Sequence, residues 1–359
     1  MNNQQLLLSG HDTIECAYYL APSEGCLLNY EQLAVHKEEL RQGKSKKPTP
    51  IKLGTEEFML AGHGTKSGYP FLIENDDFSI QFGEFNKPSF FVTFRSIALW
   101  HTSALRLNDR FIAWAESVGL KAYQPERLSR VDFSFDYHLP VIDFDEDSFI
   151  SKAVKDNQHR KNGKIQTFRF GEDAIVLRMY NKSEEITEKS AKTWFYELWG
   201  GVEKDVWRIE WQVRKPWLRG IGIHTLEDLK ERQGDLLRVL VNEHTTLRIK
   251  SDDSNRSRWS LHPLWQDLQE RVSQMEGLGV IRELDRDKLL DERMMRISIS
   301  LYGYMKRIAA ICCLQSDLPM ITHKDTQELL CIMLDQLHDP LTWENNVERR
   351  ITEMRLGEW

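Results

Sequence analysis

The sequence has few cysteines, and it lacks the patterns of a membrane protein, a disulfide-stapled secreted domain or a nucleotide-binding loop. Its five cysteines are scattered without zinc-ligand spacing, which favours reduced cytosolic thiols. We find no apolar run of membrane-spanning length and no basic start followed by an apolar segment. The glycines of GHGTKSG at 62–68 lack a nucleotide-binding fingerprint. We therefore expect a soluble cytoplasmic chain that binds no membrane.

The composition is that of a globular chain with an acidic balance. Hydrophobic residues make up 41% of the 359 residues, enough to bury a large core, and one to three domains are expected. The formal net charge of −7 argues against a non-specific nucleic-acid binder, although phosphate contacts depend on local basic patches. One such patch, residues 152–164, contains Lys161 and Lys164 and predicts either a DNA-contacting loop or a solvated one.

Three segments alternate between apolar and polar residues, as strands with one buried face do. They span residues 130–137, 172–185 and 206–214. If these strands share a sheet, their polar faces merge into one surface. That surface then carries Arg130, Asp132, Ser134 and Asp136, then Arg178, Tyr180 and Lys182, and finally Arg208, Glu210, Gln212 and Arg214.

The carboxylates of this surface have two interpretations. Asp132, Glu210 and Asp136 could hold a hard divalent cation beside a phosphodiester. Alternatively, they could form ion pairs with neighbouring arginines: Arg130, Arg208 and Arg214.

The tyrosine of this surface also has two interpretations. Arg178 and Lys182 flank Tyr180 on the same face of its strand. The two cations could neutralise a phosphate that the phenol attacks, and they could stabilise the phenolate. A tyrosine on an exposed strand is also common because of its β-propensity.

The order of the expected elements, β-α-β-β-β-α-β-α-β-β-β, is not the regular alternation of a parallel α/β fold. It predicts an α+β fold, with a largely antiparallel sheet and helices that cover one face. After residue 222 apolar residues recur at helical spacing, as at Met294, Ile297, Leu301 and Met305. We therefore expect an α+β domain over residues 1–222 and a smaller all-helical domain over 223–359.

Four motifs follow one another between residues 87 and 214. They are KPSFFVTFRSIALW, RVDFSFDYH, RMYNKSEE and WRIEWQVRK, with a helix after the first. In this order they resemble the replication initiation factor (Rep_trans) family. Its members include rolling-circle initiators of plasmids and filamentous phages, and relaxases of integrative conjugative elements. The helical part after residue 222 carries no motif of that family.

The resemblance implies an enzyme that nicks and closes DNA through a phosphotyrosyl link. The family's nucleophile pattern falls on Arg178, Tyr180, Lys182 and Glu185, its arginine-x-aspartate element on Arg130 and Asp132, and its arginine-x-glutamate element on Arg208 and Glu210. Asn181 stands where an aspartate is common, and the His-hydrophobic-His element of other rolling-circle nickases is absent.

The expected cofactor is therefore Mg²⁺ or Mn²⁺ held by carboxylates, namely Asp132 and Glu210 with Asp136 as a third ligand. The expected DNA contacts are Arg130, Arg208, Arg214, Lys161 and Lys164. The substrate would be an origin with a single-stranded or hairpin nick site, and cutting would leave a 5′-phosphotyrosyl link and a free 3′-hydroxyl. A host helicase, a host polymerase and a second copy of the chain are the expected protein partners, and we expect the helical domain to serve DNA recognition or self-association.

Other functions stay open at this point. A conjugative relaxase would use the same chemistry, a non-catalytic binder would use the sheet to hold nucleic acid, and a metal-dependent phosphodiesterase using water would not need Tyr180. Within the nicking hypothesis Tyr196 is the nearest rival nucleophile, although its aromatic neighbours favour a role in core packing.

Overall fold

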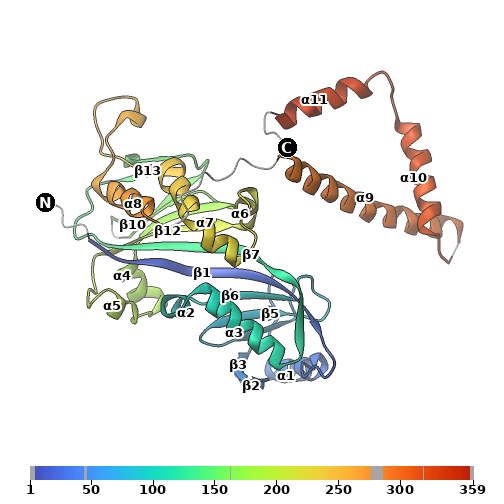
Figure 1. Cartoon of the computed structure of the whole chain (residues 1–359), viewed down its shortest axis with the longest axis horizontal. Coiled ribbons are helices and arrows are strands. Elements are labelled where there is room, and N and C mark those ends of the chain that lie inside the picture. Colours follow the sequence, from blue (N-terminus) through green and yellow to red (C-terminus); the bar gives the residue numbers. More distant parts are fainter. Residues whose placement is uncertain (1–4, 44–46, 162, 276–285, 318, 356–359) are drawn as a thin grey trace. The chain divides into compact units, whose positions relative to one another are not determined.

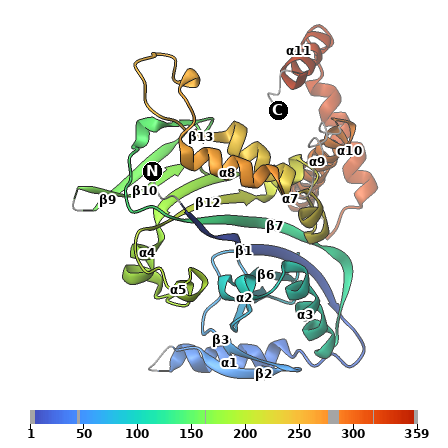
Figure 2. The ribbon, with the colours of Figure 1, turned by 60° about the vertical axis from the view of Figure 1, so that its left-hand side comes forward.

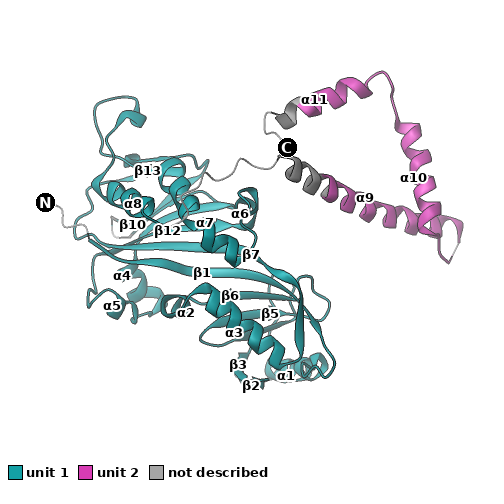
Figure 3. Ribbon diagram, in the orientation of Figure 1, with its two compact units in different colours: residues 1–283 teal, residues 284–359 magenta. Residues whose placement is uncertain are grey.

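The computed structural model describes residues 5–43, 47–161, 163–275, 286–317 and 319–355. The chain divides into two compact units, Met1–Glu283 and Leu284–Trp359 (Figure 3). The first unit holds the sheet and most helices, and the second is helical. The fold class predicted from the sequence, α+β with an antiparallel sheet and C-terminal helices, is confirmed.

The described part of the first unit is built on an 11-stranded sheet in which every pairing is antiparallel (Figure 1). The strand order is β2-β3-β4-β5-β6-β1-β7-β12-β11-β10-β9. The strands are β1 (Gln5–Pro22), β2 (Thr49–Leu53), β3 (Glu56–Leu60), β4 (Phe71–Glu74), β5 (Phe78–Phe82), β6 (Phe90–Phe94), β7 (Leu120–His138), β9 (Asp156–Lys161), β10 (Lys164–Phe170), β11 (Ile175–Asn181) and β12 (Val206–Arg214). A second sheet pairs β8 (Phe149–Ser151) with β13 (Thr245–Leu247).

The helices of the first unit begin at recognisable capping residues. Asn29, Ser103 and Thr225 each accept a backbone N–H with the side chain, at the starts of α1, α3 and α7. The helices are α1 (Tyr30–Gln42), α2 (Ser96–His101), α3 (Ala104–Ser117), α4 (Lys182–Glu185), α5 (Phe195–Leu198), α6 (Lys215–Gly220), α7 (Leu226–Val239) and α8 (Pro263–Ser273), with π-helical turns at Ile186–Ser190 and Leu240–His244.

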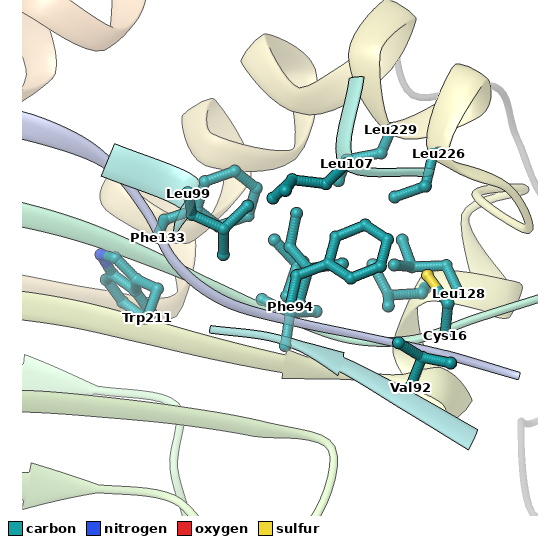
Figure 4. Close-up of a cluster of buried hydrophobic side chains, with 14 of the residues drawn as sticks. Cys16, Val92, Phe94, Leu99, Leu107, Leu128, Phe133, Trp211, Leu226 and Leu229 are labelled. Atoms are coloured by element: carbon teal, nitrogen blue, oxygen red, sulfur yellow. The ribbon is translucent and has the colours of Figure 1, made fainter. Parts of the chain in front are cut away.

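One face of the sheet is apolar and carries the main core. Helices α3, α7 and α8 pack against it, and Figure 4 shows Leu107, Leu226 and Leu229 from two of these helices above Phe94 and Cys16. Burying these side chains removes apolar area from water, which is the main stabilising term of the fold. The aromatic side chains of the three motif strands belong to this core: Phe133, Phe135, Trp207 and Trp211.

The opposite face of the sheet is covered only in part. Figures 1 and 2 show α4 and α5 on this side, away from α7 and α8. Ile186, Phe195, Trp199 and Val206 form a second, smaller cluster there. The polar side chains of the motif strands lie on this face, partly beneath that cluster.

The boundary between the units lies at 283/284, and not at 222/223 as the sequence predicted. Helices α7 and α8 complete the core of the sheet, because Leu229, Leu236, Trp265 and Leu268 are buried within it. Their apolar stripes have the same spacing whether a helix packs on a sheet or on other helices.

The second unit consists of α9 (Arg286–Ser316), α10 (His323–Leu337) and α11 (Trp343–Arg355). Many of its apolar side chains are exposed, among them Leu301, Leu314, Leu337 and Trp343. The segment Ile297–Ser316 is long and apolar enough to cross a membrane by length and composition, which the sequence analysis did not expect. One such helix is weak evidence for a membrane span.

Candidate active site

The register of three neighbouring strands brings the predicted polar residues together. Strand β12 lies between β7 and β11, so that Glu210 faces Arg178 on one side and Ser134 on the other. In the next row Arg208 lies opposite Tyr180 and Asp136. Directly opposed residues share a face of the sheet, which confirms that the polar faces merge into one surface.

Tyr180 is partly buried and is held by a carboxylate. Its hydroxyl donates a hydrogen bond of 2.9 Å to Oε2 of Glu210. Burial and the charge of Glu210 raise the pKa of Tyr180 well above its usual value, although Arg208 and Arg178 act in the opposite direction. The side chain is therefore a protonated phenol at neutral pH. Of the two flanking cations expected to stabilise a phenolate, Arg178 does lower the pKa of Tyr180, but burial and Glu210 outweigh its effect.

Lys182 lies beside Tyr180 but not on the open surface. It is the first residue of α4, it is 3% exposed, and its Nζ lies 2.6 Å from Oε2 of Glu185. Nζ also lies 5.7 Å from the centre of the Tyr180 ring and 5.2 Å from that of Phe195. Lys182 thus supports the ring and the start of α4, and its charge is already paired.

Arg178 links the two carboxylates nearest to Tyr180. Its Nη2 forms an ion pair with Oε1 of Glu210 and lies 3.9 Å from Oδ2 of Asp132. Asp132 and Glu210 are almost fully buried, whereas the side chain of Arg178 is 35% exposed. Arg178 is therefore the member of this group that can reach a ligand from solvent.

Arg130 completes the group on the side of β1. Its Nε and Nη2 donate to the two oxygens of Asp132 at 2.8 and 2.5 Å, and its Nη1 donates to Glu15 at 2.9 Å. Burial raises the pKa of Asp132 to about 6 against the opposing hydrogen bond and charge of Arg130, and the charge of Glu210 adds a smaller contribution in the same direction as burial. The cation that lies next to both carboxylates is Arg178.

Asp132 and Glu210 supply carboxylate oxygens, the donors that a divalent cation takes, on one face of adjacent strands. In the structure these oxygens already have partners. Arg130 bonds both oxygens of Asp132, and Arg178 and Tyr180 bond the two oxygens of Glu210, so the ion-pair interpretation left open by the sequence is the observed one. The hydroxyl of Ser134, opposite Glu210, is buried and has no hydrogen-bond partner. Among the residues that the structure describes, however, no group of three or more His, Cys, Asp or Glu side chains forms a metal-binding cluster.

Asp136 does not belong to this pair of carboxylates. It is fully buried, and its two oxygens accept from Nε and Nη2 of Arg208 at 2.6 and 2.8 Å. Trp199 Nε1 donates to the same carboxylate at 2.9 Å. The prediction of Asp136 as a metal ligand is therefore corrected: its oxygens are saturated by an arginine and an indole.

Arg208 is likewise corrected as a DNA contact. It is 0% exposed, and its Nη1 donates to Asp12 at 2.6 Å in addition to its bonds with Asp136. The guanidinium carbon lies 4.6 Å from the Phe195 ring centre and 5.9 Å from that of Trp100. A buried charge held in this way stabilises the sheet beneath Tyr180 and is not presented to DNA.

Asp12 also belongs to this buried polar group, through its bond with Arg208, and the pattern of the sequence does not reveal it. Alternation along β1 would place Asp12 with Ile14 on the apolar face, but a register shift between His11 and Thr13 turns it to the polar face. Two residues before Asp12, position 10 requires a glycine, because a Cβ there would lie 2.7 Å from the ring of Trp100.

The other predicted residues are placed as follows. Arg214 is exposed at the end of β12, and its Nη2 donates to Gln212 at 3.3 Å. Lys161 and Lys164 pair with each other across the β9–β10 hairpin, and their side chains lie outside the described structure. Tyr196 packs beside Trp199 in the second cluster, with ring centres 6.0 Å apart.

The aromatic face of the sheet does not offer a stacking platform for bases. Phe133, Phe135, Trp207 and Trp211 are all at most 4% exposed beneath the helices. Open-faced sheets that bind single strands expose such rings. The observed burial therefore argues against the non-catalytic binder that the sequence left open.

Comparisons with known proteins give no match to the sequence and a distant match to the fold. No family profile matches the chain, and no curated protein matches its sequence. A solved structure of the rolling circle replication initiator protein from Geobacillus stearothermophilus is similar with a TM-score of 0.43 and 15% identity. The similarity covers 76% of this chain and 98% of that one. A likeness at this level carries no functional argument, and the family resemblance of the motifs stays a prediction.

Proposed function

We propose that this protein initiates rolling-circle DNA replication by nicking one strand at an origin, with Tyr180 as the nucleophile. The observation that carries the proposal is the hydrogen bond from Tyr180 to Glu210 within a group of arginines and carboxylates on one sheet face. The motif resemblance supports it independently, because Tyr180, Asp132 and Glu210 are the residues that the family pattern selects.

The chemistry is a transesterification that needs no external energy source. The phenol oxygen of Tyr180 attacks the phosphorus of the scissile phosphodiester, the bond to the 3′-oxygen breaks, and a 5′-phosphotyrosyl bond forms. The phenolic proton passes to Oε2 of Glu210, which already accepts it, and the leaving 3′-oxygen takes a proton from water.

Arg178 is the group that meets the charge on the phosphate. When Glu210 gains the proton, its ion pair with Arg178 weakens, and the partly exposed guanidinium becomes available to the non-bridging oxygens. Lys182 and Arg208 stay buried and keep Tyr180 in place. Each of these roles uses a side chain that the fold already positions.

We also propose that Mg²⁺ or Mn²⁺ is held by Asp132 and Glu210 in place of Arg178, once that guanidinium turns to the scissile phosphate. When bound there, the ion would polarise the scissile phosphate and stabilise the leaving oxygen. The free 3′-hydroxyl would then prime a host polymerase, assisted by a host helicase. A relaxase that starts conjugative transfer would use the same residues and the same bond exchange.

The test uses the purified full chain and supercoiled DNA that carries the region flanking its own coding sequence. We expect a nicked product and a protein–DNA adduct that survives denaturation, with Mg²⁺ present and not with EDTA. Tyr180→Phe should bind this DNA without nicking it. Tyr123→Phe, which removes the hydroxyl of an exposed tyrosine, is the matched control. Nicking by Tyr180→Phe at the wild-type rate would contradict the proposal.

A further inference from the structure

The polar face that carries Tyr180 continues across two more strands to the edge of the sheet. Strand β10 pairs with β11 so that Thr167 lies opposite Tyr180 and Arg169 lies opposite Arg178. Strand β9 continues both rows, with His159 opposite Thr167 and Asn157 opposite Arg169. Because directly opposed residues share a face, these four side chains extend the surface of the candidate active site.

Arg169 is the residue of this extension that is best placed to bind an anion. The described residues give it no carboxylate partner, and its Nε makes only a 3.5 Å contact with the carbonyl of Gly171. It is partly exposed and stands directly beside a second arginine, Arg178. Because Glu210 already neutralises Arg178, Arg169 is the one of these two arginines whose charge has no carboxylate partner among the described residues.

Arg178 and Arg169 differ in their counter-charges and in their distance from Tyr180, as two arginines that bind successive phosphates of one DNA strand would. Arg178 is neutralised by Glu210 and lies next to the nucleophile, whereas Arg169 lies one strand farther out without a carboxylate. Neighbouring strands are about 4.8 Å apart. Long arginine side chains on adjacent strands can therefore reach successive phosphates of a single strand.

The rest of the surface suits a single strand that leaves the sheet. Thr167 is partly exposed, and Asn157 and His159 are exposed on β9, the outermost strand of the described sheet. Polar side chains of these types bond sugars, phosphates or base edges without adding negative charge.

We propose that the row of Arg169, Thr167, His159 and Asn157 is a track for single-stranded DNA, in which Arg169 binds a phosphate next to the scissile one. This proposal rests on the proposed function, since it takes Tyr180 as the point of cleavage. It adds a binding site to the nucleophile and assigns the β9–β10 hairpin to the strand on one side of the cut.

The test measures binding apart from cleavage. Full-length Tyr180→Phe binds a fluorescein-labelled, mixed-sequence single-stranded oligodeoxynucleotide over a range of salt concentrations. We expect Arg169→Ala in this background to weaken binding about tenfold and to lower the slope of log affinity against log salt by about 0.7, the value for one phosphate contact to a single strand. Arg160→Ala is the matched control, because Arg160 lies in the same hairpin but pairs with Glu146.

A second measurement locates the contact. Oligonucleotides shortened from either end should lose the effect of Arg169→Ala when the nucleotides on one particular side are removed, and not when the other side is shortened. An unchanged salt slope, or an equal effect of Arg160→Ala, would overturn the track even if wild-type protein nicks DNA. A normal Arg169 effect in a chain that never nicks would instead leave the track intact and refute the proposed function.

Discussion

The replacement Glu210→Gln separates the role of Glu210 as a proton acceptor from its role as a packed side chain. Glutamine has the same shape and can still accept the hydrogen bond from Tyr180 with its amide oxygen. It cannot take up the phenolic proton, and it loses the ion pair with Arg178. The change therefore removes a charge at the centre of the site and leaves the ring of Tyr180 where it is.

The expected loss of activity follows from the state of the phenol. Burial and the charge of Glu210 hold the pKa of Tyr180 well above its usual value, so that attack at neutral pH needs a base. Losing a positioned general base lowers a rate by roughly 10²- to 10⁴-fold. The cost in stability is smaller, about 1–3 kcal/mol, since Arg178 is partly exposed and keeps Asp132 as a neighbour.

The assay is single-turnover nicking of a labelled oligonucleotide over a range of pH. The variant should recover part of its activity as pH rises, because removing the charge of Glu210 lowers the pKa of Tyr180 and hydroxide can then remove the proton. Glu15→Gln is the matched control, since Glu15 belongs to the same group through Arg130 but has no bond to Tyr180. Equal rates for wild type and Glu210→Gln at neutral pH would refute the reasoning.

Three further predictions concern stability. Burial raises the pKa of Asp132 to about 6 from 3.8, so between these values the folded chain keeps a proton that the unfolded chain releases. As pH rises from about 4 to 6, the free energy of unfolding of the wild type should therefore fall by up to about 3 kcal/mol relative to that of Asp132→Asn. Urea unfolding in the presence of EDTA measures this difference, and a difference that stays constant with pH would contradict the prediction. Arg208→Ala leaves the buried carboxylates of Asp12 and Asp136 without their cation and should lower the free energy of unfolding by about 3–5 kcal/mol. The control Arg214→Ala, at an exposed arginine, should lower it by about 0.5 kcal/mol or less. Equal effects of the two replacements would place Arg208 at the surface. Gly10→Ala should cost about 1–3 kcal/mol in thermal or urea unfolding because its Cβ meets the ring of Trp100, and an unchanged midpoint would show that the ring moves aside.

Much of the sheet could be predicted because one of its faces is buried. Alternation in residues 130–137 and 206–214 must keep Phe133 and Trp211 on the core side, which sets the faces of Asp132 and Glu210 as well. The sequence could not show which part of the polar face is covered. The covering elements α4 and α5 are each four residues long and carry little periodic signal, so Arg208 looked exposed in the pattern.

Two other features depend on tertiary structure alone. The register shift that brings Asp12 to Arg208 changes the alternation of β1 by one position, and no residue type in the segment marks it. The bonds that Glu210 makes with Arg178 and Tyr180 depend on pairing between strands about 30 residues apart in the sequence. Composition and spacing could propose these residues as a group but could not say which side chain bonds which.

The most direct test of the central claim is to map the DNA-linked peptide after trypsin digestion of the covalent adduct. Cleavage after Arg178 and Lys182 releases residues 179–182, whereas Tyr196 falls in residues 193–204, so the two tyrosines separate by mass. We predict that the phosphonucleotide mass is found on the peptide that contains Tyr180. Recovery of that mass on the peptide that contains Tyr196 would contradict the assignment of the nucleophile.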